Sequence, residues 1–577
     1  MISTPNRYLV MSPFWLVWWA LFLAIAWLVP NHFPPWAAFH ADAWMALMAL
    51  IGALALLWRV RSAVIWHAMP CMVASLVLWP WLQFSLGLIP FAGQAWMSVS
   101  YLAGFLLALL VGARWESVSS RQLEQALFLA VGVAAIVSVW LQFYTWLGLW
   151  EGGVMDIWSM GLSGERPYAN LGQPNNLATL LLWGLLACLW AYLAGLMSRF
   201  SAVFLACFLL IGLALTQSRM GMLALTAVLV AIWFWRHLWP TRRLPWVASG
   251  LYVYFLLCPL FLKWLHTALL LGQDGSFLRL QQQGELRLSA WRLFFQAVLE
   301  RPWFGYGWTE LGSAQMAVAD QFPSLGVTFG HAHNLFLDLV LWNGLPLGLL
   351  ISGVLIRWFW LRLRAVRRSE DAALFMVLGV VGIHAMVELP LHYAYFLLPV
   401  GLVMGILNVR LAARVIGTTP SWTLAAVWLA AALALGLIIQ DYFHVEASYN
   451  TLRFEKARIG LGKGPAGKPP DVLTLTQHRE WIRLARFEVR PGMSSQELDW
   501  MAALTRTYPS TGAVYRLATA LALNDRPDEA RAWLGKICKI ADEQECQQVQ
   551  RAWKQESLND PRTAAIKWPE GVMGVRF

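Results

Sequence analysis

Apolar runs about as long as a membrane-spanning helix recur along this chain from residue 12 to residue 440. About 20 consecutive apolar residues are needed to cross the ~30 Å hydrocarbon core of a bilayer. Composition agrees, because only 13% of the residues are charged, against about 25% in an ordinary soluble domain. The sequence therefore predicts an all-α polytopic membrane protein with about thirteen transmembrane helices. The predicted spans are 12–30, 41–58, 68–88, 95–113, 124–148, 176–196, 200–216, 221–236, 245–263, 335–356, 371–388, 393–409 and 421–440.

The distribution of arginine predicts the orientation of these spans. Cytoplasmic loops are enriched in Lys and Arg. If the N-terminus is cytoplasmic, every loop on that side contains arginine, whereas the outer loops 31–40 and 89–94 contain neither Lys nor Arg. We therefore expect a cytoplasmic N-terminus, an uncleaved first helix and an external C-terminal part. The net charge of +11 then comes mostly from the arginines of the cytoplasmic loops. It gives no reason to predict a nucleic-acid partner.

Several polar segments interrupt the apolar pattern, and the predicted topology puts all of them on the outer side. Arginine, histidine and glutamate are costly at membrane depth and usually face a cavity in which chemistry or transport takes place. Three segments add arginine to the side that is otherwise poor in positive charge, and binding of an anion is the simplest reason. The segments are Arg166–Asn176, Gln217–Arg219, Arg287–Gly307, Gly330–Asn334 and His384–Tyr393.

Two regions outside the spans are long enough to fold. The loop 264–334 contains an amphipathic stretch, Leu286–Leu299, and loops of this length tend to be functional. After the last span, a flexible linker at 460–470 precedes helical patterns, of which YRLATALALNDRPDEARAWL at 515–534 resembles a tetratricopeptide hairpin. We divide the chain into a transmembrane catalytic domain, residues 1–443 with the loop 264–334, and an external helical, tetratricopeptide-like domain, residues 444–577.

The six cysteines fall into two environments. Four lie in predicted spans and are expected to be buried apolar side chains: Cys71, Cys188, Cys207 and Cys258. Cys538 and Cys546 lie in the external domain, where an oxidising compartment would let them pair, and the sequence leaves this open. No Cys and His spacing resembles a zinc site, and the outer loops hold no paired-aspartate signature for Mg²⁺ or Mn²⁺. We therefore predict neither a metal nor a cofactor.

The outer segments together resemble a known superfamily. His333-Asn334, followed after nine residues by Gly344, resembles the histidine signature of the Wzy/WaaL-type O-antigen ligases and polymerases. TQSRMG at 216–221, LRLSAW at 286–291 and RPWFGYG at 301–307 resemble its other blocks. NLGQPNNLA at 170–178 and HAMVELPLHYAYFLLP at 384–399 resemble the bacterial PglL-type protein O-oligosaccharyltransferases. The chain departs from the ligase pattern at Leu347, where a small or aromatic residue is expected.

This resemblance implies an enzyme, a lipid-carrier-dependent glycosyltransferase of the bacterial inner membrane with its outer segments in the periplasm. It implies transfer of a preassembled glycan from undecaprenyl diphosphate to Ser or Thr of a periplasmic protein such as a pilin, with inversion and without metal. The expected partners are the lipid-linked donor, the acceptor protein and membrane lipid. Two alternatives stay open: ligation of O-antigen to the lipid A core, and a lipid-linked glycan transporter or flippase. Against a transporter, the charges collect at one face, whereas transport sites usually lie near the midplane.

The expected residue roles follow from the resemblance and from side-chain chemistry. Guanidinium groups match phosphate oxygens and keep their charge, and imidazole can accept a hydroxyl proton near neutral pH. His333 is the expected catalytic base. The diphosphate is expected to bind Arg166, Arg219, Arg287 and Arg292, and the glycan or acceptor to contact Gln173, Asn175, Asn176, His331, Asn334, Glu388 and Tyr393.

Each of these residues also has a structural alternative. Arg219 could be an interfacial residue, and Arg287 or Arg292 could be merely solvated. Glu388 could pair with Arg166 or His384. The amides of Gln173, Asn175 and Asn176 could cap the following helix, and Tyr393 and Tyr395 could belong to an aromatic belt at the membrane interface.

Overall fold

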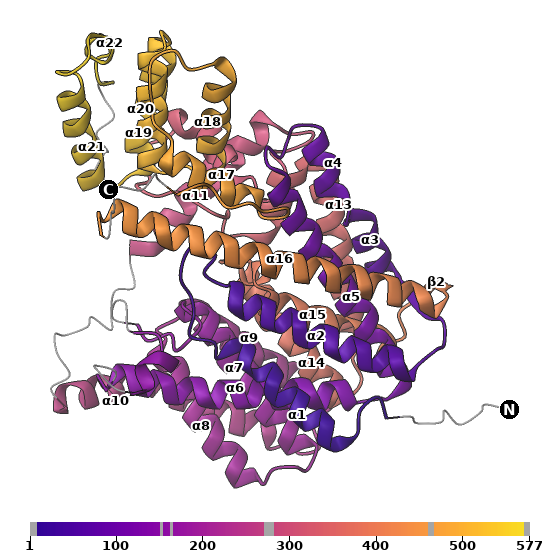
Figure 1. The fold of residues 1–577 in the computed structure, drawn as a ribbon. Helices are drawn as coiled ribbons and strands as arrows, with labels where there is room; N and C mark the ends of the chain where they lie inside the picture. Colours follow the sequence, from indigo (N-terminus) through magenta and orange to yellow (C-terminus); the bar gives the residue numbers. More distant parts are fainter. Residues whose placement is uncertain (1–8, 150–153, 162–165, 270–281, 460–466, 570–577) are drawn as a thin grey trace. The chain divides into compact units, whose positions relative to one another are not determined.

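The computed structural model describes residues 9–149, 154–161, 166–269, 282–459 and 467–569, and these residues are mostly helical (Figure 1). Within them, strands are limited to β1 (Val64–His67) and β2 (Val415–Thr419), which pair antiparallel. The all-α prediction is therefore confirmed at the level of fold class. Most of the linker predicted at 460–470 lies outside the described residues.

Long apolar helices recur between residues 39 and 456. Eight helical segments are long and apolar enough to cross a membrane. They are α2 (Phe39–Arg59), the pair α3 (Ala68–Leu76) and α4 (Trp79–Ser85), α5 (Ala92–Val118), α6 (Gln122–Trp146), α7 (Pro174–Leu193), α10 (Leu244–Ala268), α13 (Leu335–Ala365) and α16 (Ser421–Lys456). A multi-pass membrane protein is confirmed by these helices.

Shorter apolar helices occupy the other predicted spans. Four of them are α1 (Pro13–Ala24) with the 3₁₀ turn η1 (Ile25–Trp27), α8 (Arg199–Leu215), α9 (Arg219–Phe234) and α15 (Ala394–Arg410). α14 (Ser369–Ala385) coincides with the remaining one. Every predicted apolar run is thus helical, but helix length and composition do not fix the number of crossings, so the count of thirteen spans stays a prediction.

The remaining elements are short or amphipathic. They are η2 (Val154–Trp158), α11 (Gln282–Glu300), α12 (Leu311–Val318), η3 (Ala319–Gln321), η4 (Pro390–His392), α17 (Thr476–Arg486), α18 (Ser495–Thr507), α19 (Thr511–Leu523), α20 (Pro527–Ile540), α21 (Glu543–Glu556) and α22 (Pro561–Ala564). α11 contains the amphipathic stretch predicted at 286–299, and α19 and α20 pack against each other as the hairpin predicted at 515–534. A tetratricopeptide domain stays a prediction.

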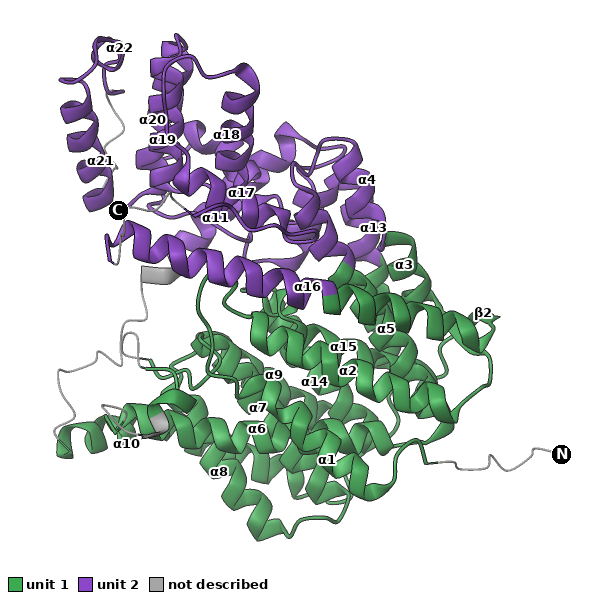
Figure 2. Ribbon diagram, in the orientation of Figure 1, with its two compact units in different colours: residues 1–76, 100–279, 354–436 green, residues 77–99, 280–353, 437–577 purple. Residues whose placement is uncertain are grey.

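The chain forms two compact units, each assembled from three separate segments (Figure 2). Unit 1 consists of 1–76, 100–279 and 354–436, and unit 2 of 77–99, 280–353 and 437–577. The two-domain division at residue 443 was predicted from membrane topology. Contacts within the chain do not test membrane topology, so this division stays a prediction.

Unit 1 contains a buried ionic cluster that joins four of its helices. Arg410 in α15 contacts Glu116 in α5 at 2.9 Å and Glu124 in α6 at 2.5 Å. Its guanidinium also lies 3.5 Å from Asp371 in α14. Buried charges are tolerated when they are paired, and removal of one partner is strongly destabilising. This cluster therefore holds the ends of α5, α6, α14 and α15 together.

Unit 2 contains a buried carboxylate that joins two of its segments. Glu310, just before α12, accepts hydrogen bonds from Ser313 Oγ at 2.6 Å and from Thr507 Oγ1, at the end of α18, at 3.2 Å. Burial raises the pKa of Glu310 to about 7. Elsewhere in unit 2, a disulfide joins Cys538 in α20 to Cys546 in α21, which resolves the pairing that the sequence left open.

Candidate functional site

The histidine motif lies in unit 2, in the loop that leads into α13. His333 has a φ of 55°, a left-handed conformation that is uncommon for residues other than glycine. Its neighbour Ala332 is fixed on both sides, because its N–H donates to Asp338 Oδ1 at 2.8 Å and its carbonyl accepts from Trp291 Nε1 at 2.9 Å. Strained backbone persists only where surrounding contacts determine it, and these two bonds supply such contacts.

The two histidine rings are neighbours. Their centroids lie 4.0 Å apart, and the backbone N–H of His333 donates to His331 Nδ1 at 3.2 Å. A neutral histidine that accepts at Nδ1 carries its proton on Nε2. Asn334 Oδ1 accepts from the N–H groups of Phe336 at 3.1 Å and Leu337 at 3.2 Å, so Asn334 caps the start of α13. His331 orients the backbone of His333, and Asn334 orients the helix that follows.

The glycine of the histidine signature marks a break in α13. Gly344 has a φ of 77°, outside helical geometry. At the break, Leu345 N donates to Pro302 O at 2.7 Å, and Tyr306 N donates to Leu341 O at 2.8 Å. A side chain at Gly344 would collide with the carbonyl of Trp303. The segment RPWFGYG at 301–307 therefore packs against the break in α13 through backbone contacts, and these contacts leave no room for a side chain at Gly344.

The two predicted arginines of α11 differ in exposure. Arg287 is half-buried, whereas Arg292 is exposed. The helix is held to the histidine loop by Trp291 and by Phe294, whose ring lies 5.7 Å from that of Phe329. Exposure of Arg292 agrees with the alternative that one of the two arginines is solvated.

A second group of predicted residues lies in unit 1, at the starts of α7 and α9 and after α14. Arg166 Nε donates to the carbonyl of Thr216 at 2.9 Å. Burial lowers the pKa of Arg166, the positive charge of Arg219 lowers it further, and the negative charge of Glu388 raises it. The guanidinium groups of Arg166 and Arg219 therefore repel each other, and the carboxylate of Glu388 attracts Arg166. Such an arrangement is suited to an anion.

Glu388 is surrounded by amide donors. Gln173 Nε2 and Asn175 Nδ2 each donate to its carboxylate at 3.3 Å, and Ser218 Oγ donates to Asn175 Oδ1 at 2.6 Å. Gln173 is the N-cap residue of α7 but makes no side-chain cap hydrogen bond. The capping alternative is therefore wrong for Gln173, because its amide donates to Glu388.

The tyrosines after Glu388 are packed inside unit 1. Tyr393 and Tyr395 stack with centroids 5.1 Å apart, and Asn176 Nδ2 donates to Tyr395 OH at 3.2 Å. Tyr395 is fully buried, so the aromatic-belt alternative is wrong for this residue. Asp42 in α2 accepts from Ala394 N at 2.6 Å and thereby fixes the start of α15.

The structure thus brings together Arg166, Gln173, Asn175, Asn176, Arg219, Glu388 and Tyr393 in unit 1, and places Arg287, Arg292, His331, His333 and Asn334 in unit 2. Sequence reasoning missed Asp42, Ser218 and Asp338 as positioning residues. Asp42 and Asp338 each lie near the start of an otherwise apolar run, which was a usable signal. Trp291 was recognised as part of the segment LRLSAW, but the sequence did not predict its hydrogen bond to the carbonyl of Ala332.

Comparison with known proteins gives matches to three protein families. Residues 202–352 match the O-antigen ligase family, residues 167–191 match a protein glycosylation ligase family, and residues 372–556 match the C-terminal part of a virulence factor membrane-bound polymerase family. A general O-oligosaccharyltransferase of Acinetobacter baylyi is 29% identical over 547 residues, which cover 90% of this chain and 92% of the relative.

Residues 202–352 of the chain are therefore similar to the O-antigen ligase family.

A second relative, a ComP-specific O-oligosaccharyltransferase of Acinetobacter baylyi, is 32% identical over 252 residues, or 42% of this chain and 44% of the relative. Both relatives are glycosyltransferases by name, and the predicted enzyme class is confirmed. The O-antigen ligase match contains Arg219, Arg287 and the histidine motif, and the glycosylation ligase match contains the amides of α7.

Proposed function

We propose that this glycosyltransferase transfers a preassembled glycan from undecaprenyl diphosphate to Ser or Thr hydroxyls of a periplasmic protein such as a pilin. The observation that carries the proposal is the polar cluster at the start of α9. Arg166 Nε donates to the carbonyl of Thr216 at 2.9 Å, and Ser218 Oγ donates to Asn175, whose amide donates to Glu388. Two guanidinium groups that repel each other are stabilised by a ligand with two or more negative charges, and a diphosphate is such a ligand.

The diphosphate has two roles in this proposal. It anchors the donor before the reaction, and it carries the developing negative charge as the glycosidic bond breaks. Preorganised donors near developing charge commonly contribute about 2.7–4 kcal/mol each. Arg166 and Arg219 of unit 1 are the proposed ligands of the diphosphate. These two arginines can provide positive charge, so we propose transfer without a metal.

His333 is the proposed general base. Its imidazole takes the proton of the acceptor hydroxyl as that oxygen attacks the anomeric carbon. The bond from the anomeric carbon to the phosphate oxygen breaks, and undecaprenyl diphosphate leaves from the opposite face. The new glycosidic bond is therefore inverted, and no covalent glycosyl-enzyme forms. His331 and Asn334 hold the base and its loop in place.

Glu388 and its amide donors are proposed to contact the glycan or the acceptor. The carboxylate and its partners Gln173 and Asn175 form a rigid polar group, of the kind that orients hydroxyl-rich ligands. Tyr393 provides an aromatic face next to Tyr395. These side chains would select the acceptor, whereas the arginines recognise the carrier.

A protein acceptor is favoured over the lipid A core because both relatives are named O-oligosaccharyltransferases. We also propose that the reaction takes place at the periplasmic face of the inner membrane, with a cytoplasmic N-terminus and a periplasmic C-terminal domain. A transporter is not needed to explain the charges, since the chain is a glycosyltransferase.

One assay tests the acceptor. The purified full-length enzyme is incubated with an undecaprenyl-diphosphate-linked glycan and either a pilin or a lipid A core oligosaccharide, and the products are identified by mass spectrometry. We expect a glycosylated Ser or Thr in the pilin. Glycan on the lipid A core with unmodified pilin would contradict the proposal, and glycan-free products with both acceptors would contradict the transferase role.

A further inference from the structure

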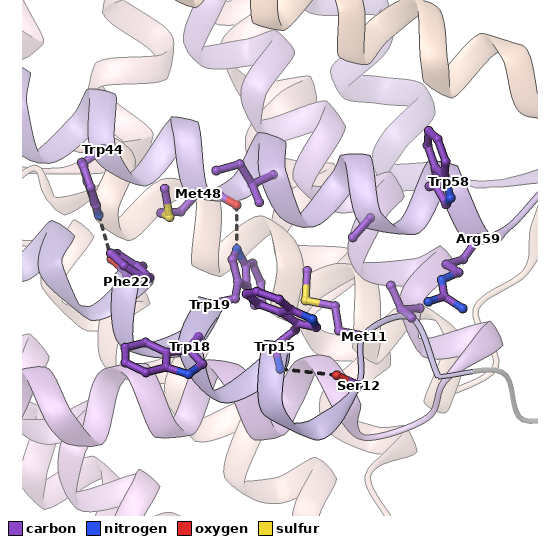
Figure 3. Close-up of a pocket in the computed structure, with 13 residues that line it drawn as sticks. Met11, Ser12, Trp15, Trp18, Trp19, Phe22, Trp44, Met48, Trp58 and Arg59 are labelled. Carbon is purple, nitrogen blue, oxygen red and sulfur yellow. Dashed lines mark hydrogen bonds between the residues drawn. The ribbon is translucent and has the colours of Figure 1, made fainter.

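Unit 1 has two apolar cavities away from the residues discussed so far. The first lies between α1 and α2 and has a volume of about 790 Å³ (Figure 3). Trp15, Trp18 and Trp44 line it, and Trp58 and Arg59 lie together at one end. Arg59 is the only basic residue among the lining residues. The first cavity therefore provides a hydrocarbon surface with a single positive charge.

The second cavity is enclosed by α7, α8, α9 and α10 and has a volume of about 930 Å³. Its walls are apolar over most of their area, with Leu189, Phe204, Leu229 and Leu251 contributed by the four helices. We call it the four-helix groove. Lipid-facing helices normally carry a convex apolar surface, so a groove of this size is suited to a hydrocarbon chain.

Positive charge is concentrated at one end of the four-helix groove. Arg199 and Arg243 both line it, beside Thr241. Arg199 is the first residue of α8, and Arg243 is the N-cap residue of α10. Among the described residues, neither arginine forms a salt bridge. Both arginines are exposed, so their guanidinium groups are accessible to an anion at this end of the groove.

The length of the four-helix groove matches one leaflet of a bilayer. Its lining residues on α8 run from Arg199 to Leu210, which corresponds to about 16 Å at 1.5 Å per residue. Half of the hydrocarbon core is about 15 Å. A ligand with an anionic head at the arginines and a chain of leaflet length would fill the groove.

We propose that the four-helix groove binds an anionic glycerophospholipid from the leaflet at which the arginine-rich loops lie. The phosphate lies between Arg199 and Arg243, and the acyl chains lie between α7, α8, α9 and α10. The isoprenoid chain of the donor does not explain the two arginines, because it is uncharged. Its diphosphate is assigned above to Arg219, at the opposite end of α9.

Native mass spectrometry of the detergent-solubilised full-length enzyme tests this site with phosphatidylglycerol, phosphatidylcholine and undecaprenyl phosphate as probes. An arginine near anionic lipid contributes about 1 kcal/mol, so we expect the wild type to retain phosphatidylglycerol at least about fivefold more tightly than phosphatidylcholine. The double variant Arg199→Gln/Arg243→Gln should lose this preference. The matched control Arg59→Gln, which removes the arginine of the first cavity, should keep it.

A second variant separates the groove from general surface charge. Ala206 lines the four-helix groove, and Ala206→Phe should fill it and reduce retention of both phospholipids. Equal retention of the two phospholipids by the wild type would overturn the proposal. So would an unchanged preference in the double variant, or displacement of phosphatidylglycerol by equimolar undecaprenyl phosphate, which would assign the groove to the donor's chain. None of these readouts depends on glycosyl transfer, so the proposed function can fail independently.

Discussion

Trp291 donates its indole N–H to the backbone carbonyl of Ala332 across 2.9 Å, and so ties α11 to the loop that carries His333. The bond acts on backbone next to a histidine in the left-handed region. Together with the hydrogen bond from Ala332 N to Asp338, it fixes the residue between the two histidines. Trp291 is therefore a positioning residue for the proposed base.

Loss of this bond should slow transfer without weakening donor binding. Trp291→Phe keeps an aromatic ring but removes the N–H, and a neutral hydrogen bond contributes about 0.5–1.5 kcal/mol. We expect kcat to fall by up to about tenfold with KM for the donor unchanged. Trp246→Phe, at an exposed tryptophan of α10, should leave both constants unchanged. A rise in KM with constant kcat would show that Trp291 contacts the donor instead.

Replacement of the proposed base should nearly abolish transfer. Removal of a general base costs about 10²–10⁴-fold in rate, so His333→Ala should bind the lipid-linked donor but form product at a small fraction of the wild-type rate. His331→Ala should have a milder effect, because His331 accepts a backbone hydrogen bond from His333 and so acts on the position of the base. Single-turnover assays measure both. An inactive His331→Ala beside an active His333→Ala would reverse the assignment, and a product with retained anomeric configuration would exclude single displacement.

The bidentate geometry of Arg219 should matter as much as its charge. Arg219→Lys keeps the charge but loses the guanidinium fork, so we expect a loss of at least about tenfold in kcat/KM for the donor. Arg236 lies exposed just beyond the other end of α9, and Arg236→Lys is the matched control with wild-type activity. Near wild-type transfer by Arg219→Ala, at normal expression, would remove the diphosphate role.

Transfer should survive removal of divalent cations. The proposed site neutralises the diphosphate with arginine, so exhaustive treatment of the purified enzyme with EDTA should leave the initial rate unchanged. Inactivation by EDTA followed by recovery with Mg²⁺ or Mn²⁺ would show that a metal ion supplies part of the positive charge.

Glu310 should make the stability of the enzyme depend on pH. Its pKa is raised from 4.5 to about 7 in the folded state, so the folded state favours the protonated carboxyl. Its contribution is therefore fully present below pH 4.5 and is lost as pH rises through 7, by at most about 3 kcal/mol. Thermal unfolding in detergent between pH 5 and 8 should show Tm falling with pH. Glu310→Gln keeps an acceptor for Ser313 and Thr507 and should flatten that slope, and an equally steep slope in the variant would assign it to another group.

The sequence was sufficient to locate the helices and the chemically distinctive residues. Long apolar runs leave the backbone no alternative to a helix within a membrane, and each predicted run is helical. Arginine and histidine beside such runs are conspicuous, which is why Arg166, Arg219 and His333 could be proposed. Contacts with the backbone were not predictable, since Ala332 has no side-chain signal for its bonds to Trp291 and Asp338. The hydrogen bond from the amide of Gln173 to Glu388 was not predictable either, because the two residues are 215 positions apart in the sequence.

The φ of 55° at His333 also restricts which amino acids can stand at this position. Asparagine tolerates the left-handed region far better than alanine or a β-branched residue does. A His333→Asn variant would therefore preserve the path of the main chain while removing the imidazole, whereas His333→Val would change both. Random mutagenesis of this codon should consequently recover folded but inactive protein mainly as asparagine or glycine, so that selection for folding and selection for catalysis act separately at one residue.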